Sequence, residues 1–259
     1  NQKESWFFPS IRMPQGAGKW FLQSFREGKK RCGRPQHGSR WAPMSESPLV
    51  IAIDGPAASG KSTVARRVAA ALGMVFVNSG AMYRAFTWWV LKNGLDPLDT
   101  SAVLALLART EFTCGEEDGV GTIAIGGQFL TREELASPEV NAGVSAIATI
   151  AEVRERLVAE QRRYAAACGV VMEGRDIGSV VFPDTSCKFY IDASPEVREA
   201  RRRAEGIADS ITTRDQIDSS RKTSPLVVAP DAVVVDSSEM GIDEVVETVM
   251  RVIREKAGI

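Results

Sequence analysis

From residue 49 onward, short apolar runs alternate with stretches in which apolar residues recur every three or four positions. The short runs are rich in β-branched residues and predict buried strands, whereas the longer stretches predict amphipathic helices. The predicted strands are 49–53, 75–77, 169–173, 188–192 and 232–236. The predicted helices are 61–72, 81–93, 100–109, 138–150, 152–167, 195–203, a polar helix ending near Arg221, and 242–256. This alternation is typical of an α/β fold, in which helices cover a parallel sheet.

The pattern changes between residues 111 and 130, where turn-forming residues become frequent. The segments GEEDGVG and IGGQ stand on either side of the short apolar run TIAI. Asp-Gly and Gly-Gly pairs favour the tight turns of β-hairpins, because these residues tolerate positive φ angles. We therefore expect a small antiparallel insertion here.

The first 47 residues differ from the rest of the chain in charge and in pattern. They hold nine Lys or Arg against three Glu, a net charge of +6, whereas residues 48–259 have a net charge of −7. They show no helical or strand period. One interpretation is a basic arm that binds nucleic acid. We favour a disordered or non-native basic extension before a compact domain at 48–259, and we do not expect nucleic-acid binding.

The composition is that of an ordinary soluble globular protein, with 44% apolar and 25% charged residues. No apolar run approaches the ~18 residues that a membrane span needs, and no signal-peptide pattern opens the chain. We therefore expect a cytoplasmic protein without a membrane partner. We also expect a monomer, although the sequence does not determine the oligomeric state. The cysteines lack CxxC spacing, so neither a zinc site nor a disulfide framework is indicated: Cys32, Cys114, Cys168 and Cys187.

A phosphate-binding motif joins the first predicted strand to the first predicted helix. It is a complete GxxxxGK[ST] sequence, Gly55-Pro56-Ala57-Ala58-Ser59-Gly60-Lys61-Ser62. Its glycines permit the backbone angles that let consecutive N–H groups wrap a triphosphate, and the helix N-terminus adds positive potential. We expect Lys61 to reach the β and γ oxygens of ATP and Ser62 to hold Mg²⁺.

Such a phosphate-binding loop, or P-loop, occurs in several classes of protein, so other residues must choose among them. Residues 48–259 contain no histidine, which excludes a histidine base or a histidine metal ligand in this part of the chain. Phosphoryl transfer to another phosphate needs neither, but two adjacent polyanions require several rigid cations. Arginines at predicted turns and helix ends meet this need: Arg84, Arg175, Arg214 and Arg221.

The positions of these arginines are informative. Arg175 and Asp176 directly follow a predicted buried strand, at the carboxyl edge where α/β sheets bind ligands. Arg214, Asp218 and Arg221 are spaced i, i+4 and i+7, so they share one face of the predicted polar helix. That face is either part of the site or an ordinary salt-bridged exterior, and the pattern leaves both interpretations open.

Five motifs, in this order, resemble those of the bacterial cytidylate kinase family: IDGPAASGKST, NSGAMYR, EGRDIGSVVFPD, IDASPEVREARRR and RDQIDSSR. They extend over nearly all of residues 48–257. The resemblance implies a nucleoside monophosphate kinase that moves the γ-phosphoryl group of ATP to CMP or dCMP in pyrimidine nucleotide metabolism. It also implies a P-loop kinase fold with a five-stranded parallel core sheet, a CMP-binding insertion at about 98–150 and a short lid at about 203–213.

The same resemblance implies roles for individual side chains. On the ATP side it adds Thr63 and Arg201 to the P-loop. Around the CMP phosphate it places Ser79, Arg84, Arg175 and Arg221. It assigns cytosine to Ser145, Arg154 and Asp176, and ribose to Arg214 and Asp218. The catalytic cations it implies are Lys61, Arg175, Arg214 and Arg221.

The chain departs from the family pattern in two places. Ala136 stands where the family usually has an arginine, and the segment AEGIADSITT before Arg214 is shorter than the usual lid. Two other hypotheses stay open, and the second of them rests on these departures. One is another small P-loop kinase that acts on UMP, shikimate or dephospho-CoA. The other is a nucleotide-binding regulatory module that has lost turnover.

Overall fold

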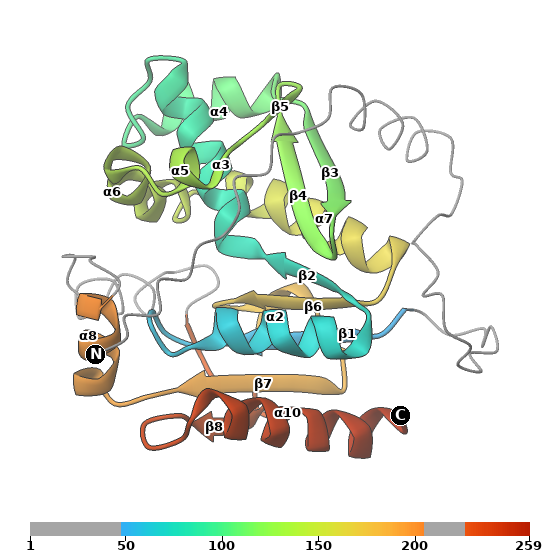
Figure 1. Ribbon diagram of the computed structural model, residues 1–259. Helices are drawn as coiled ribbons and strands as arrows, with labels where there is room; N and C mark the ends of the chain where they lie inside the picture. Colours follow the sequence, from blue (N-terminus) through green and yellow to red (C-terminus); the bar gives the residue numbers. More distant parts are fainter. Residues whose placement is uncertain (1–47, 205–225) are drawn as a thin grey trace. The chain divides into compact units, whose positions relative to one another are not determined.

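The computed structural model describes residues 48–204 and 226–259, and its central feature is a mixed β-sheet flanked by helices (Figure 1). The strands are β1 (Val50–Asp54), β2 (Val75–Asn78), β3 (Phe112–Glu117), β4 (Val120–Ile125), β5 (Gln128–Phe129), β6 (Val170–Gly174), β7 (Cys187–Asp192) and β8 (Val233–Asp236). Their order in the sheet is β3-β4-β2-β6-β1-β7-β8, with β5 paired to β4. Strands β2, β6, β1, β7 and β8 run parallel to one another, which confirms the predicted five-stranded parallel core.

Each strand of the parallel core is followed along the chain by a helix or helical turn, as expected of an α/β fold. They are α2 (Lys61–Leu72), α3 (Ser79–Lys92), α4 (Thr100–Ala108), α5 (Arg132–Leu135), α6 (Pro138–Ile147), α7 (Ala151–Ala167), the π-helical turn η1 (Ile177–Val181), α8 (Pro195–Ala204) and α10 (Ile242–Ala257). Helix α6 ends three residues before the predicted boundary, because Ile150 is already the extended N-cap of α7. The short α5 and η1 are absent from the predicted elements, since four or five residues show too little of a period. None of the helices in the described part of the chain is long and apolar enough to cross a bilayer.

Strands β3 and β4 form the antiparallel hairpin that the turn residues predict. Their register runs from Phe112 opposite Ile125 to Glu117 opposite Val120. The two turn residues, Asp118 and Gly119, have φ angles of 50° and 77°, as the favoured two-residue hairpin turn requires. Val120 also pairs in parallel with Phe76 of β2. The hairpin therefore continues the core sheet at its β2 edge.

The strand that precedes the P-loop is buried on both of its faces. Ile51 and Ile53 of β1 pack with α2 and α10, whereas Ala52 between them packs with α3 and α7. Side chains alternate across a strand, so these two sets belong to opposite faces of the sheet. Helices α2 and α10 lie on the same side in Figure 1. All three residues are fully buried, which makes β1 a rigid base for the loop that follows it.

Some predictions lie outside the described residues. These are the character of the basic segment 1–47, most of the predicted lid at 203–213, and the polar helix ending near Arg221. They stay predictions.

Candidate active site

The loop between β1 and α2 has the backbone of a phosphate cradle. Gly55 has a φ angle of +152°, and a Cβ atom there would lie 2.1 Å from the carbonyl oxygen of Ile191, so only glycine fits. Gly60 has a φ angle of +88° and is the N-cap of α2, where no side chain caps the helix. The first N–H groups of α2 have no acceptor within the helix, and they favour an anion. This geometry supports the predicted binding of phosphates.

A cavity of about 280 Å³ lies along this loop and gathers most of the predicted site residues. Those that line it are Ala57, Ala58, Gly60, Lys61, Ser62, Thr63, Ser79, Arg84, Ser145, Arg154, Arg175 and Asp176. The lining also holds residues that had no predicted role: Asn78, Gly80, Tyr83, Val144, Ala148, Glu173, Gly174 and Arg202. Among these described residues, five cations face two carboxylates. The excess of positive charge suits a polyanionic ligand.

Lys61 contacts the P-loop and is largely withdrawn from solvent. Its side chain is buried, with 6% of the residue exposed, and Nζ donates a hydrogen bond to the carbonyl oxygen of Pro56 at 2.7 Å. A charge that is already withdrawn from water interacts more strongly with a phosphate than an exposed charge does. The ammonium group is therefore held beside the N–H groups that would receive the phosphates.

The carboxyl ends of β2 and β6 meet beside the P-loop. Asn78 ends β2 and caps α3, because its Oδ1 accepts a hydrogen bond from the N–H of Ala81 at 2.8 Å. Ser79 Oγ donates to the carbonyl oxygen of Glu173 in β6 at 2.8 Å. A Cβ atom on Gly174 would lie 2.6 Å from this Oγ, so glycine lets the two strand ends approach. The contact fixes the start of α3 against the segment that carries Arg175.

Arg84 and Arg175 border the same cavity as Lys61, and both are half-buried. The guanidinium of Arg84 lies 3.3 Å from where a Cβ atom on Gly80 would be, so it folds back over the start of α3. Arg175 Nη1 donates to the carbonyl oxygen of Gly55 at 3.1 Å. An arginine with a purely surface role would extend into bulk solvent, and neither of these two does.

A buried ion pair also lines the cavity. Arg154 of α7 and Asp176 are 4% and 6% exposed, and Nη2 of the arginine donates to Oδ2 of the aspartate. Arg154 Nη1 also donates to the carbonyl oxygen of Ala148 at 3.3 Å, and its guanidinium lies 5.5 Å from the ring centroid of Tyr83. Ser145 of α6 lines the same region. A hydroxyl, a guanidinium and a carboxylate thus line the same cavity, and their role in binding cytosine stays a prediction.

Glu173 is a site residue that the sequence analysis missed. It is buried, and its Oε1 accepts a hydrogen bond from Ser62 Oγ at 2.6 Å. Its place at the end of a buried strand was the available signal, since ligands bind at that edge. A hydroxyl and a carboxylate oxygen are the donors that Mg²⁺ prefers, and kinases hold this ion by one or two such groups together with substrate phosphates. Ser62 and Glu173 therefore fit the expected ion.

Arg201 and Arg202 of α8 differ from each other in whether they line the cavity. Arg201 donates from Nη1 to Ser237 Oγ at 3.1 Å and from Nη2 to the carbonyl oxygen of Ser237 at 2.8 Å. Ser237 Oγ lies 3.1 Å from the carbonyl oxygen of Ser59, so Arg201 adjoins the P-loop without lining the cavity. Arg202, which had no predicted role, does line it. A run of arginines does not reveal which member faces the ligand.

Asp54, the last residue of β1, carries a carboxyl group whose ionisation is unusual. Burial, and to a smaller extent nearby Asp176, raise the pKa of Asp54 more than the backbone N–H groups of Gly178 and Ile177 and the charge of Lys61 lower it, so the pKa moves from 3.8 to about 6. The folded state therefore binds a proton more tightly than the unfolded state does. The resulting contribution to stability is fully present below pH 3.8 and is lost as the pH rises through about 6.

We expect Asp54→Asn to remove this pH dependence. Between pH 4 and pH 7 the free energy of unfolding of the wild type should fall relative to that of the variant by up to about 3 kcal/mol, because one pKa unit corresponds to about 1.4 kcal/mol. Urea unfolding of both proteins at several pH values measures the difference. Parallel pH profiles would contradict the raised pKa.

Three predicted site residues lie outside the described residues: Arg214, Asp218 and Arg221. Ala136, where the family usually has an arginine, is described. It is the C-cap of α5 and is not part of the cavity lining.

Comparisons with known proteins identify the family of this chain. The family model described as "Cytidylate kinase" matches residues 51–255. A protein named cytidylate kinase from Streptomyces avermitilis is 41% identical over 217 residues, which is 80% of this chain and 94% of that protein. One from Alkaliphilus metalliredigens is 44% identical over 217 residues, covering 80% and 96%. One from Geobacillus kaustophilus is 41% identical over 221 residues, covering 81% and 98%. The chain therefore belongs to the cytidylate kinase family.

Proposed function

We propose that this protein transfers the γ-phosphoryl group of ATP to the phosphate of CMP or dCMP, giving ADP and CDP or dCDP, as a step of pyrimidine nucleotide metabolism. The observation that carries the proposal is the cavity in which the P-loop, two half-buried arginines and the Arg154–Asp176 pair meet. The names of the similar proteins support the choice of acceptor.

On the donor side, the N–H groups of the P-loop and the ammonium of Lys61 bind the phosphates of ATP. Ser62 and Glu173 hold Mg²⁺, which when bound neutralises part of the charge on the phosphates. Thr63 lines the cavity one residue further along α2. Arg201 stabilises the loop from outside through Ser237.

On the acceptor side, Ser79, Arg84 and Arg175 bind the CMP phosphate, with Arg221 as a fourth group outside the described residues. An oxygen of this phosphate attacks the γ-phosphorus, and the bond from the γ-phosphorus to the oxygen of the leaving ADP breaks. The attacking oxygen carries charge near neutral pH, so no general base is required. The protein contributes position and positive charge, which are the main terms in phosphoryl transfer.

Cytosine is recognised by the pair Arg154 and Asp176 together with Ser145. The exocyclic amine of cytosine is a donor, whereas uracil has a carbonyl oxygen at the same place. A carboxylate that only accepts hydrogen bonds favours the amine and disfavours the carbonyl. Asp176 therefore supplies the preference for CMP over UMP. Arg214 and Asp218, outside the described residues, bind the ribose in this proposal.

A panel of acceptors tests the proposal. With coupled detection of ADP, the wild type should use CMP and dCMP well above UMP, shikimate and dephospho-CoA. Asp176→Ala should lower kcat/KM for CMP by about 100-fold, the value of one hydrogen bond to a charged group, and should bring CMP and UMP close together. The matched control is Asp184→Ala, which removes an exposed carboxylate from the loop after η1.

The panel, together with calorimetry of CMP binding, also distinguishes the alternatives. Turnover of a different acceptor in place of CMP would identify another small P-loop kinase. Binding of CMP in calorimetry without formation of ADP would identify a regulatory module. Unchanged CMP preference in Asp176→Ala would remove that residue from base recognition.

A further inference from the structure

The turn that carries Arg175 and Asp176 needs support from outside itself. It leaves β6 and enters η1 at Asp176, whose backbone angles are φ −147° and ψ 24°. Within the turn, the N–H groups of Val181 and Phe182 donate to the carbonyl oxygens of Asp176 and Ile177 at 3.2 and 2.7 Å. The first N–H groups of any helical turn have no acceptor inside it. At η1 these are the N–H groups of Ile177 and Gly178.

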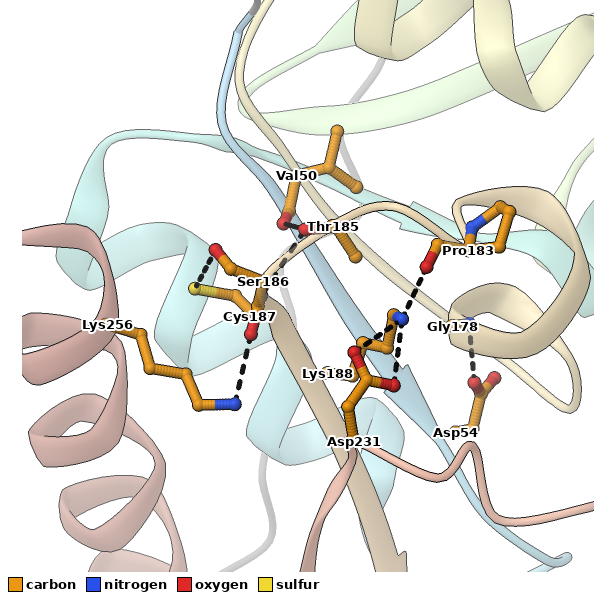
Figure 2. Close-up of polar contacts among 10 residues, drawn as sticks. All are labelled: Val50, Asp54, Gly178, Pro183, Thr185, Ser186, Cys187, Lys188, Asp231 and Lys256. Carbon is orange, nitrogen blue, oxygen red and sulfur yellow. Dashed lines mark hydrogen bonds and ion pairs between the residues drawn. The ribbon is translucent and has the colours of Figure 1, made fainter.

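Asp54 accepts both of these N–H groups. Its Oδ1 accepts from Ile177 at 2.8 Å and its Oδ2 from Gly178 at 2.7 Å, and Figure 2 shows the second contact. Asp54 stands directly before Gly55, the first residue of the P-loop. The carboxylate of Asp54 therefore connects the start of the P-loop to the start of the turn that carries Arg175 and Asp176. The hydrogen bond from Arg175 to the carbonyl oxygen of Gly55 connects the same two segments.

A carboxylate suits this place better than any other side chain of its size. Both partners are N–H donors, so both side-chain oxygens must accept. Asparagine would turn an NH₂ group toward one donor and lose that bond. Asp54 is only 5% exposed and lies near Asp176, which makes ionisation costly. A buried carboxylate at this position lowers stability, so stability alone does not explain it. Residues that are unfavourable for stability are most often found at functional positions.

The far side of the turn is held by a second polar group. Lys188 of β7 is buried, and its Nζ donates to the carbonyl oxygen of Pro183 and to both carboxylate oxygens of Asp231, at 2.9 and 2.7 Å (Figure 2). The stem of Lys188 lies 3.2 Å from where a Cβ atom on Gly178 would be. Gly178 is thus enclosed between Asp54 and Lys188. The turn has little freedom to shift unless one of these contacts is lost.

We infer that Asp54 is a positioning residue, which sets the acceptor-binding turn of Arg175 and Asp176 at the correct distance from the P-loop. The inference rests on the proposed function, because it concerns the alignment of CMP with ATP. Asp54 touches neither nucleotide in this scheme. It acts through the turn, so its loss should change the use of CMP far more than the binding of ATP.

The test compares full-length wild type with Asp54→Asn. We expect kcat/KM for CMP to fall by about 10- to 100-fold, as displacement of a reacting group by about 1 Å does, with KM for ATP within about twofold. Urea unfolding at pH 7 should show no loss of stability, because the variant no longer buries a charge. Equal effects on CMP and ATP, or a loss of stability that parallels the loss of activity, would assign Asp54 a purely structural role. Unchanged kcat/KM for CMP would also overturn the inference.

Two further variants keep the test decisive. Asp243→Asn removes an exposed carboxylate at the start of α10 and should leave the kinetics unchanged. Gly178→Ala inserts a Cβ atom 3.2 Å from the stem of Lys188 and 3.4 Å from Oδ2 of Asp54, which disturbs the same junction without changing its charge. If Asp54→Asn does not fold, a rise in KM for CMP in Gly178→Ala supports the inference and an unchanged KM refutes it.

The failure of this inference differs from the failure of the proposed function. A wild type that does not phosphorylate CMP refutes the function itself. A wild type that does so, beside an Asp54→Asn variant with the same kcat/KM for CMP, refutes only the positioning role.

Discussion

Lys61→Met is expected to lower kcat about a thousandfold while the fold stays intact. Methionine has a similar length and no charge, so the buried stem of the lysine is replaced without a cavity. What is lost is a preorganised cation in a partly dry site, where a single such group contributes about 10²- to 10³-fold to the rate. The hydrogen bond from Nζ to the carbonyl oxygen of Pro56 is lost as well, but it joins two parts of one loop.

The measurement is kcat with saturating ATP and CMP, with thermal unfolding as the check on folding. Lys92→Met is the matched control. Lys92 belongs to α3 and is exposed, its Nζ lies 4.3 Å from the ring centroid of Trp88, and it does not line the cavity. We expect this control to keep its activity. A Lys61→Met variant with kcat within tenfold of the wild type would contradict the proposed role of the P-loop lysine.

Arg154→Met should destabilise the protein by about 3–5 kcal/mol, the typical effect of removing one partner of a buried ion pair. The substitution removes the guanidinium of Arg154 and leaves the carboxylate of Asp176 buried without a cationic partner. It also leaves Asp176 close to Asp54, so two buried carboxylates then repel each other. The effect should exceed that of Asp176→Asn, which removes a negative charge from this crowded region. Urea unfolding at pH 7 provides the measurement.

A double variant separates stability from function. Arg154→Met with Asp176→Leu replaces the pair by apolar side chains and should recover most of the lost stability, since buried ion pairs are seldom more stable than packed hydrophobic groups. It should not recover the use of CMP. Arg67→Met is the control for a surface pair, because Arg67 and Asp243 are both exposed, and it should cost less than about 1 kcal/mol. If Arg154→Met itself lowers the free energy of unfolding by less than about 1 kcal/mol, the pair does not contribute as a buried ion pair is expected to.

The sequence by itself determined the elements and the donor loop. Hydrophobic periodicity placed α2 at its observed bounds and the five parallel strands within one residue of theirs. The Asp-Gly turn predicted the β3–β4 hairpin, because its backbone angles are a local property. The P-loop could be predicted equally well, because its glycines and lysine belong to one continuous segment of the chain. The five ordered motifs were specific enough to indicate the family that the comparisons then showed.

Only the tertiary structure decided which side chains meet at the ends of different strands. Ser62 and Glu173 are 111 residues apart in the chain, and Asp54 and Gly178 are 124 apart. They come together because β6 lies between β2 and β1, with Asp54 in register with Gly174. A period of alternating residues reports which face of a strand is buried and says nothing of its neighbours. Hydrogen bonds between distant strands set that order, so the roles of Glu173 and Asp54 appeared only once the sheet was assembled.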